Sequence, residues 1–138
     1  MNMLNSDCID DPTSSMSYIR SPEDVAKMTV QTLERSVPCS VPGITFLSGG
    51  LTEEDSSIFL NAINSIERKG PWVMTFSFSR ANQSSALKAW AGKKENVESA
   101  QKALLARAQA NSEASEGKYV AGSQPSDQES LYVKNYVY

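Results

Sequence analysis

ITFLSGGLTEED, residues 44–55, is the stretch that decides the fold. Its apolar run ends abruptly at Ser48, Gly49 and Gly50, and an acid-rich helical pattern begins within a few residues. A short run of β-branched and aromatic residues between glycines is typical of a buried strand. Thr52 is a candidate N-cap for the helix that follows. The stretch therefore predicts a strand that leads directly into a helix.

The same succession extends in both directions along the chain. We expect helices over 21–36, 52–67 and 93–115, strands over 43–50 and 72–78, and a further helical segment from residue 81 that Gly92 interrupts. The expected buried faces are Val25, Met28, Thr32 and Leu33, then Ile58, Phe59, Ala62, Ile63 and Ile66, and last Val97, Ala100, Leu104 and Ala108. Residues 1–17 are predicted to be an irregular leader, and residues 117–138 a flexible tail.

Composition narrows the class of protein. The chain has 138 residues, of which 40% are hydrophobic and 21% are charged, which is ordinary for one globular domain. A net charge of −3 without a basic patch argues against nucleic acid, and no apolar run suggests a membrane span. Histidine is absent, so zinc sites built on histidine and Ser-His triads are excluded, and we expect no metal or cofactor. Cys8 and Cys39 are interpreted as free thiols in a reducing compartment.

Alternation of helices and strands predicts an α/β fold with parallel strands and right-handed crossovers. Both predicted strands are apolar on both faces, so each needs a neighbour on either side. Two strands alone cannot form a parallel sheet that is covered on both faces. We therefore interpret the chain as part of a larger α/β structure, and expect it to associate or to fold poorly by itself.

The ends of the two strands are the candidate binding site. The C-terminal end of a strand and the N-terminus of the next helix present backbone N–H groups that attract anions. Gly49 and Gly50 would let the backbone approach a phosphate closely, and Ser48 adds a hydroxyl group. Ser79 and Arg80 follow the second strand, where a guanidinium could bind two phosphate oxygens. A tight turn without a ligand, and a solvated Arg80, remain the alternatives.

The motifs ITFLSGG, LNAIN, PW-x-x-TFSF-x-RA, SALKAWAGKKEN and the terminal Tyr138 together resemble the C-terminal portion of class I fructose-1,6-bisphosphate aldolases, over about residues 21–138. The resemblance implies that the strands are the last two of a (β/α)8 barrel, with residues 18–116 as a partial barrel. It also implies that Ser48, Gly49, Gly50, Ser79 and Arg80 bind a phosphate of fructose 1,6-bisphosphate. Tyr138 matches a terminal tyrosine that assists proton transfer.

The family's reaction is the reversible aldol cleavage of fructose 1,6-bisphosphate through a lysine Schiff base, carried out in glycolysis by a cytoplasmic homotetramer. That lysine lies on strand six, for which the sequence shows no counterpart. We therefore interpret the chain as a truncated or fragmentary aldolase that keeps the sugar-phosphate site and is inactive by itself. The alternatives are a non-catalytic interaction protein that docks on a full-length aldolase or another partner, and an α/β fragment without a present function.

Three residues near the site depart from the family pattern. Ser79 stands where the family has glycine, so a backbone conformation restricted to glycine would be strained there. Leu51 replaces a residue that is usually polar, and Asn82 replaces one that is usually apolar.

Overall fold

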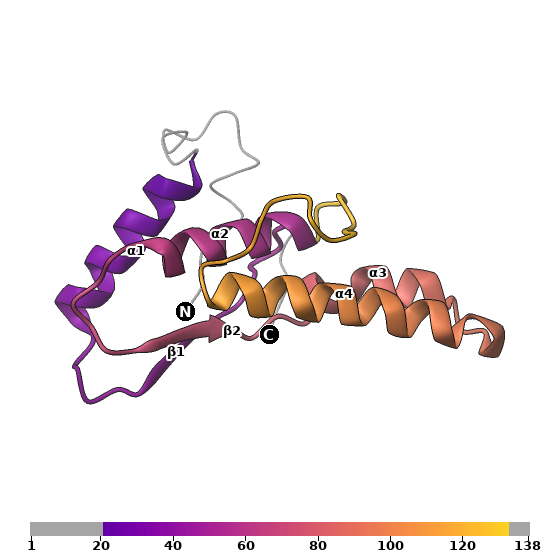
Figure 1. Cartoon of the computed structure of the whole chain (residues 1–138), viewed down its shortest axis with the longest axis horizontal. Coiled ribbons are helices and arrows are strands. Elements are labelled where there is room, and N and C mark those ends of the chain that lie inside the picture. Colours follow the sequence, from indigo (N-terminus) through magenta and orange to yellow (C-terminus); the bar gives the residue numbers. More distant parts are fainter. Residues whose placement is uncertain (1–20, 133–138) are drawn as a thin grey trace.

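The computed structural model describes residues 21–132. Its elements follow one another in the order α1 (Pro22–Ser36), β1 (Gly43–Phe46), α2 (Glu53–Ser65), β2 (Val73–Phe76), α3 (Arg80–Trp90), the short 3₁₀ helix η2 (Lys94–Asn96) and α4 (Val97–Ser115) (Figure 1). The expected alternation of helices and strands is confirmed. The predicted leader over 1–17 lies outside the described residues.

The two strands pair in parallel, as expected. Ile44 is the partner of Met74, and Phe46 is the partner of Phe76. Both strands are shorter than predicted, because regular pairing ends after Phe46 and Phe76. One further hydrogen bond, from the Ser77 N–H to the Phe46 carbonyl (2.7 Å), holds the two strand ends side by side.

The first two long helices begin at the predicted caps. The Ser21 side chain accepts a hydrogen bond from the Asp24 N–H at 3.1 Å, and the Thr52 hydroxyl accepts one from the Asp55 N–H at 3.0 Å. Such caps satisfy backbone donors that the first helical turn leaves without partners. The caps fix where α1 and α2 start, and α2 therefore starts immediately after the glycine turn.

The buried face of α1 differs from the prediction. Met28 is 54% exposed and Thr32 is exposed, with its hydroxyl bonded to the Met28 carbonyl at 2.8 Å. The residues that face the core are Val25, Ala26, Val30 and Leu33. The helical spacing of the apolar residues in α1 is compatible with either face being buried. Packing against α2 determines which face is buried. In α2, Ile63 is buried as predicted and Ile58, Phe59, Ala62 and Ile66 are partly buried.

The sheet is covered on one face. Phe46 and Met74 point into the core with Trp72 and Leu60, all of them almost fully buried. On the other face Val73 is 67% exposed and Thr45 is exposed. On this second face the Thr75 hydroxyl contacts the Ser115 hydroxyl of α4 at 3.2 Å, but Val73 and Thr45 stay exposed, as expected for two strands that cannot be covered on both faces.

The last two helices, α3 and α4, form a pair that extends beyond the end of the sheet (Figure 1). The predicted buried face of α4 is wrong, since Val97 and Leu104 are 43% and 41% exposed. The face that is buried carries Arg107, Ala110, Asn111 and Ala114. The exposed face lines an apolar groove of about 280 Å³, formed by Ala86, Leu87, Trp90, Val97, Ala100, Gln101 and Leu104. None of the helices between residues 21 and 132 is long and apolar enough to cross a membrane.

Candidate functional site

The glycine turn follows β1 directly. Gly49 and Gly50 have φ angles of 66° and 95°, which residues other than glycine rarely adopt. The Leu51 N–H donates a hydrogen bond to the Ser48 carbonyl at 3.3 Å. Within residues 21–132 the N–H groups of Gly49 and Gly50 donate no hydrogen bond. Ser48 is buried beside them. The turn therefore presents two backbone donors of the kind that bind anions.

The second half of the site is the start of α3. Arg80 is its first residue, and Ser79 precedes it as the N-cap without a side-chain capping bond. The φ angle of Ser79 is −97°, which lies outside the region that requires glycine, so the expected strain is absent. Asn82 has a polar partner, because its side-chain oxygen accepts a hydrogen bond from the Asn111 amide at 3.0 Å, and Leu51 is buried.

Residues of the tail join the two halves. The Leu131 N–H donates to the Gly50 carbonyl at 3.0 Å, and the Leu131 carbonyl accepts a hydrogen bond from the Arg80 guanidinium. Tyr132 lies so close that a Cβ on Gly50 would be 3.0 Å from its Cα. Arg80 and Gly50 therefore lie at the same edge of the strand pair, as predicted. Tyr138 lies outside the described residues.

A buried network that sequence reasoning missed lies directly behind the glycine turn. It consists of Glu53, Glu54, Ser57, Arg107, Asn111 and Tyr119, all buried. Arg107 donates from Nη2 to the Glu53 carbonyl at 2.7 Å and to the Ser57 hydroxyl at 2.6 Å. The signal in the sequence was the spacing of Arg107, Ala110, Asn111 and Ala114. These positions form one helical face, on which three residues are small or polar enough to leave room for a buried guanidinium.

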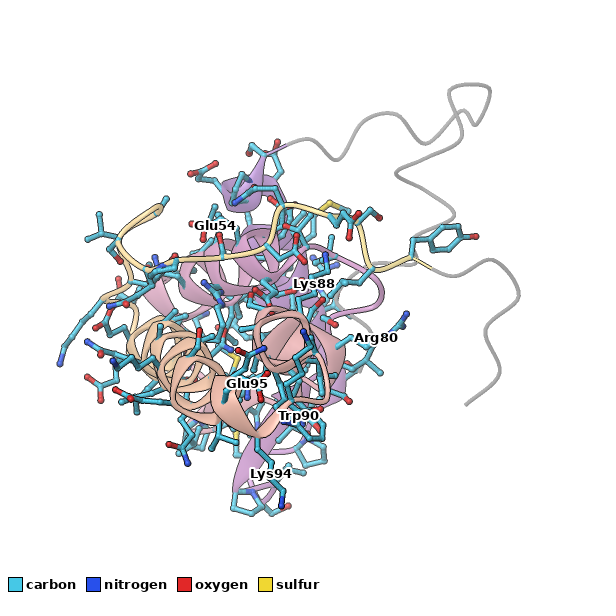
Figure 2. All side chains as sticks on the ribbon, turned by 90° about the vertical axis from the view of Figure 1, so that its right-hand side faces the viewer. Glu54, Arg80, Lys88, Trp90, Lys94 and Glu95 are labelled. Atoms are coloured by element: carbon cyan, nitrogen blue, oxygen red, sulfur yellow. The ribbon has the colours of Figure 1, made fainter. Side chains whose placement is uncertain are left out.

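The tail runs over α2 and contacts this network at Glu54, which is labelled in Figure 2. The Glu54 carboxylate accepts hydrogen bonds from the Tyr119 hydroxyl at 2.9 Å and from the Gly122 N–H at 2.8 Å. Burial, and then the neighbouring Glu54 carboxylate, raise the pKa of Tyr119 above its usual value. The segment from residue 117, predicted to be a flexible tail, is thus fixed to α2 by specific polar contacts.

A second contact fixes the tail to α3. Lys88 donates to the carboxylates of Asp127 and Glu129, and this ammonium group lowers the pKa of Asp127. Within the described part of the chain, no cluster of three acidic or cysteine side chains could hold a metal ion. Cys39 is a free, exposed thiol. The groups at the strand ends are the backbone N–H groups of the glycine turn and the guanidinium of Arg80.

Comparison with known proteins identifies the class to which this fold and site belong. The family model of class I fructose-bisphosphate aldolase matches residues 3–138. The chain is 52% identical over 118 residues to the fructose-bisphosphate aldolase of Drosophila melanogaster, 55% over 119 residues to a cytoplasmic isozyme of Spinacia oleracea, and 53% over 129 residues to a cytosolic aldolase of Arabidopsis thaliana. These matches cover 86%, 86% and 92% of the chain.

A solved structure agrees with the sequence matches. The fructose-bisphosphate aldolase of Plasmodium falciparum, crystallised with TRAP and a small-molecule inhibitor, superposes with a TM-score of 0.73 at 50% identity, over 77% of this chain and 30% of that chain. The chain spans about a third (33%) of the length of the curated relatives it matches. It belongs to the class I fructose-bisphosphate aldolase family, whose fold is a (β/α)8 barrel.

Proposed function

We propose that Ser48, Gly49, Gly50, Ser79 and Arg80 form a binding site for the phosphate group of a sugar phosphate, with fructose 1,6-bisphosphate as the ligand that the names of the relatives suggest. The observation that carries the proposal is the parallel pairing of β1 and β2. It brings the donors of the glycine turn and the guanidinium of Arg80 to one edge of the sheet, where the α2 and α3 N-termini add their positive dipole ends.

The proposed activity is sugar-phosphate binding without aldol cleavage. The family's Schiff-base chemistry needs a lysine amine that is held inside the barrel and partly desolvated. Among the described residues, the lysines lie on helices or in loops, and none lies at the C-terminal end of β1 or β2. The chain would then act in the cytoplasm, where the isozyme names of the plant relatives place those proteins.

Titration of fructose 1,6-bisphosphate against the wild-type chain and Arg80→Ala tests the proposal. Loss of the one guanidinium should weaken binding by about tenfold or more, because hydrogen bonds to charged groups each contribute about 1.5–3 kcal/mol. Arg35→Ala is the matched control, since Arg35 is exposed at the end of α1, away from the site. Equal affinity of the wild type and Arg80→Ala would show that Arg80 is only a surface charge.

A second candidate function is that of a non-catalytic interaction protein that docks on a full-length aldolase. The exposed apolar groove between α3 and α4, with Leu87 58% and Trp90 43% exposed, favours it. Trp90, Lys94 and Glu95 mark the end of this helix pair that faces the viewer in Figure 2. Sedimentation of the chain mixed with a full-length aldolase should then show a heavier species, which Leu104→Lys removes. If no heavier species forms, the docking function is wrong.

A further inference from the structure

Glu53 is a buried carboxylate at an unusual place. It is the first residue of α2, it follows the glycine turn, and it is 0% exposed. A carboxylate that is removed from water is costly unless hydrogen bonds or an opposite charge compensate it. An acidic residue at a helix N-terminus could interact with the helix dipole just as well from the surface. The groups that donate hydrogen bonds to the Glu53 carboxylate must therefore account for its burial.

Those partners come from the two other segments that form or cover the proposed site. Oε1 of Glu53 accepts a hydrogen bond from the Ser85 N–H at 2.9 Å, and Oε2 accepts one from the Ser85 hydroxyl and one from the Asp127 N–H, the latter at 2.9 Å. Ser85 lies on α3, the helix that starts with Arg80. Asp127 lies in the tail that continues to Leu131. One carboxylate thus contacts the helix that carries the guanidinium and the segment that contacts Gly50.

Arg107 balances the charge of Glu53 without an optimal ion pair. Its Nε is 4.0 Å from Oε2 of Glu53 and is the buried polar nitrogen that lacks a hydrogen-bond partner among the described residues. Its Nη2 instead bonds the Glu53 carbonyl and the Ser57 hydroxyl, both on α2. A buried pair of this kind is weak evidence for stability. The hydrogen bonds of Arg107 therefore fix the start of α2 in place, while its distance from the Glu53 carboxylate is not that of an optimal ion pair.

We propose that Glu53 is a positioning residue for the phosphate site: its carboxylate holds the start of α2, and with it the glycine turn, at a fixed distance from Arg80 on α3. This inference depends on the proposed function. The two halves of the site belong to different β/α units, which are joined at the strand ends by the pairing of β1 with β2 and by the tail residue Leu131. The Glu53 side chain lies on α2 next to the site and contacts Ser85 on α3, so its carboxylate sets the spacing that one phosphate needs in order to reach both sets of donors.

A merely structural role for Glu53 predicts something different. In that case the Glu53→Gln variant would unfold more easily, but each folded molecule would bind phosphate as the wild type does. If Glu53 instead places Arg80, the loss of its carboxylate should weaken phosphate binding only while Arg80 is present. A double-mutant cycle between Glu53→Gln and Arg80→Ala separates the two roles, because residues that act through one another are not additive.

The experiment titrates inorganic phosphate into the full chain and follows the N–H signals of Gly49 and Gly50 by NMR. Glu53→Gln should bind about 3–10-fold more weakly, the range that corresponds to coupling energies between interacting residues. In the Arg80→Ala background it should have no further effect. Glu95→Gln, which removes the same charge from an exposed position outside the site, should bind like the wild type.

Ser85→Ala is the second variant, in case Glu53→Gln does not fold. It removes the hydroxyl donor and leaves the Ser85 N–H bond, so it should weaken binding about 2–3-fold. Wild-type affinity in Ser85→Ala, and in Glu53→Gln if it folds, overturns the positioning role, while a weakened Arg80→Ala would leave the proposed function intact. Wild-type affinity in Arg80→Ala itself would overturn both.

Discussion

The N–H of Leu131 donates a hydrogen bond to the carbonyl of Gly50 at 3.0 Å, and this places the Leu131 carbonyl against the Arg80 guanidinium. The tail therefore occupies the guanidinium of Arg80, a hydrogen-bond donor that a phosphate group would also use. Leu131→Pro removes the N–H and should loosen this contact. We predict that it raises the affinity for inorganic phosphate about threefold, which corresponds to the net contribution of one ordinary hydrogen bond.

Calorimetric titration of the wild type and Leu131→Pro checks this prediction. Leu131→Ala is the control, since it keeps both backbone groups of the residue and loses only part of the side chain that packs against the core. Its gain in affinity should be smaller than that of the proline variant. An unchanged or weaker affinity in Leu131→Pro would mean that the tail stabilises the site and does not compete for it.

Gly50→Ala should be among the most destabilising substitutions of a glycine in the described region. The residue has φ +95°, and an added Cβ would be 3.0 Å from the Tyr132 Cα. Gly92 is a matched control because it has φ +72° and no neighbour within 4 Å. Urea unfolding should show a loss of about 1–2 kcal/mol for Gly92→Ala and about 1 kcal/mol more for Gly50→Ala. Equal losses would show that contact with the tail contributes nothing.

Arg107→Met should leave the carboxylates of Glu53 and Glu54 buried without their cation, since Arg107 Nη1 is 3.6 Å from Glu54 Oε2. Removal of one partner from a buried charge pair lowers the free energy of unfolding by about 3–5 kcal/mol. The same change at the exposed residue Lys102, which pairs with Glu98, should alter it by less than about 0.5 kcal/mol. Thermal unfolding followed by circular dichroism compares the two variants, and similar curves would refute the prediction.

Tyr119 should make stability depend on pH in the alkaline range. Because burial raises its pKa in the folded chain above the usual value of 10.0, the unfolded chain loses this proton first as pH rises. The folded state then binds more protons, so the free energy of unfolding falls above about pH 10. Urea midpoints at about pH 9 and about pH 11 should differ less in Tyr119→Phe than in the wild type. An equal difference in both would show that Tyr119 ionises alike in the folded and unfolded chains.

Borohydride trapping with fructose 1,6-bisphosphate should give no lysine adduct. Lys27 and Lys88 lie on α1 and α3 and are exposed, so neither amine is held in the desolvated position that Schiff-base chemistry needs. A full-length class I aldolase treated in parallel is the positive control. Peptide mapping that finds an adduct on any lysine of this chain, together with turnover of the sugar, would contradict the proposed lack of cleavage.

The order of the elements, the parallel pairing and both N-caps could be read from the sequence, because each depends on local chemistry at Ser21, Thr52 and the two apolar runs. The glycine turn could be found for the same reason. The buried face of α4 could not, because its most apolar residues, such as Leu104, are exposed while Arg107 is fully buried. Hydrophobic periodicity cannot anticipate a buried guanidinium, whose partners lie on α2.

The tail was the other part that the sequence did not reveal. Gly, Ser and Asp are typical of mobile segments, and the prediction of flexibility followed from that composition. The same small polar residues are also those whose backbone N–H groups can reach a buried carboxylate, as Gly122 reaches Glu54 and Asp127 reaches Glu53. Composition could not distinguish the two outcomes, because the carboxylates that accept these bonds are remote in the sequence.

The apolar groove between α3 and α4 also affects how stability responds to temperature. Exposure of apolar surface on unfolding is what makes the heat capacity of the unfolded chain larger than that of the folded chain. Leu87, Val97 and Leu104 are already in contact with water in the folded chain, so they add little to that difference. The stability curve of the chain should therefore be flatter than its length implies, and it should steepen when a partner covers the groove.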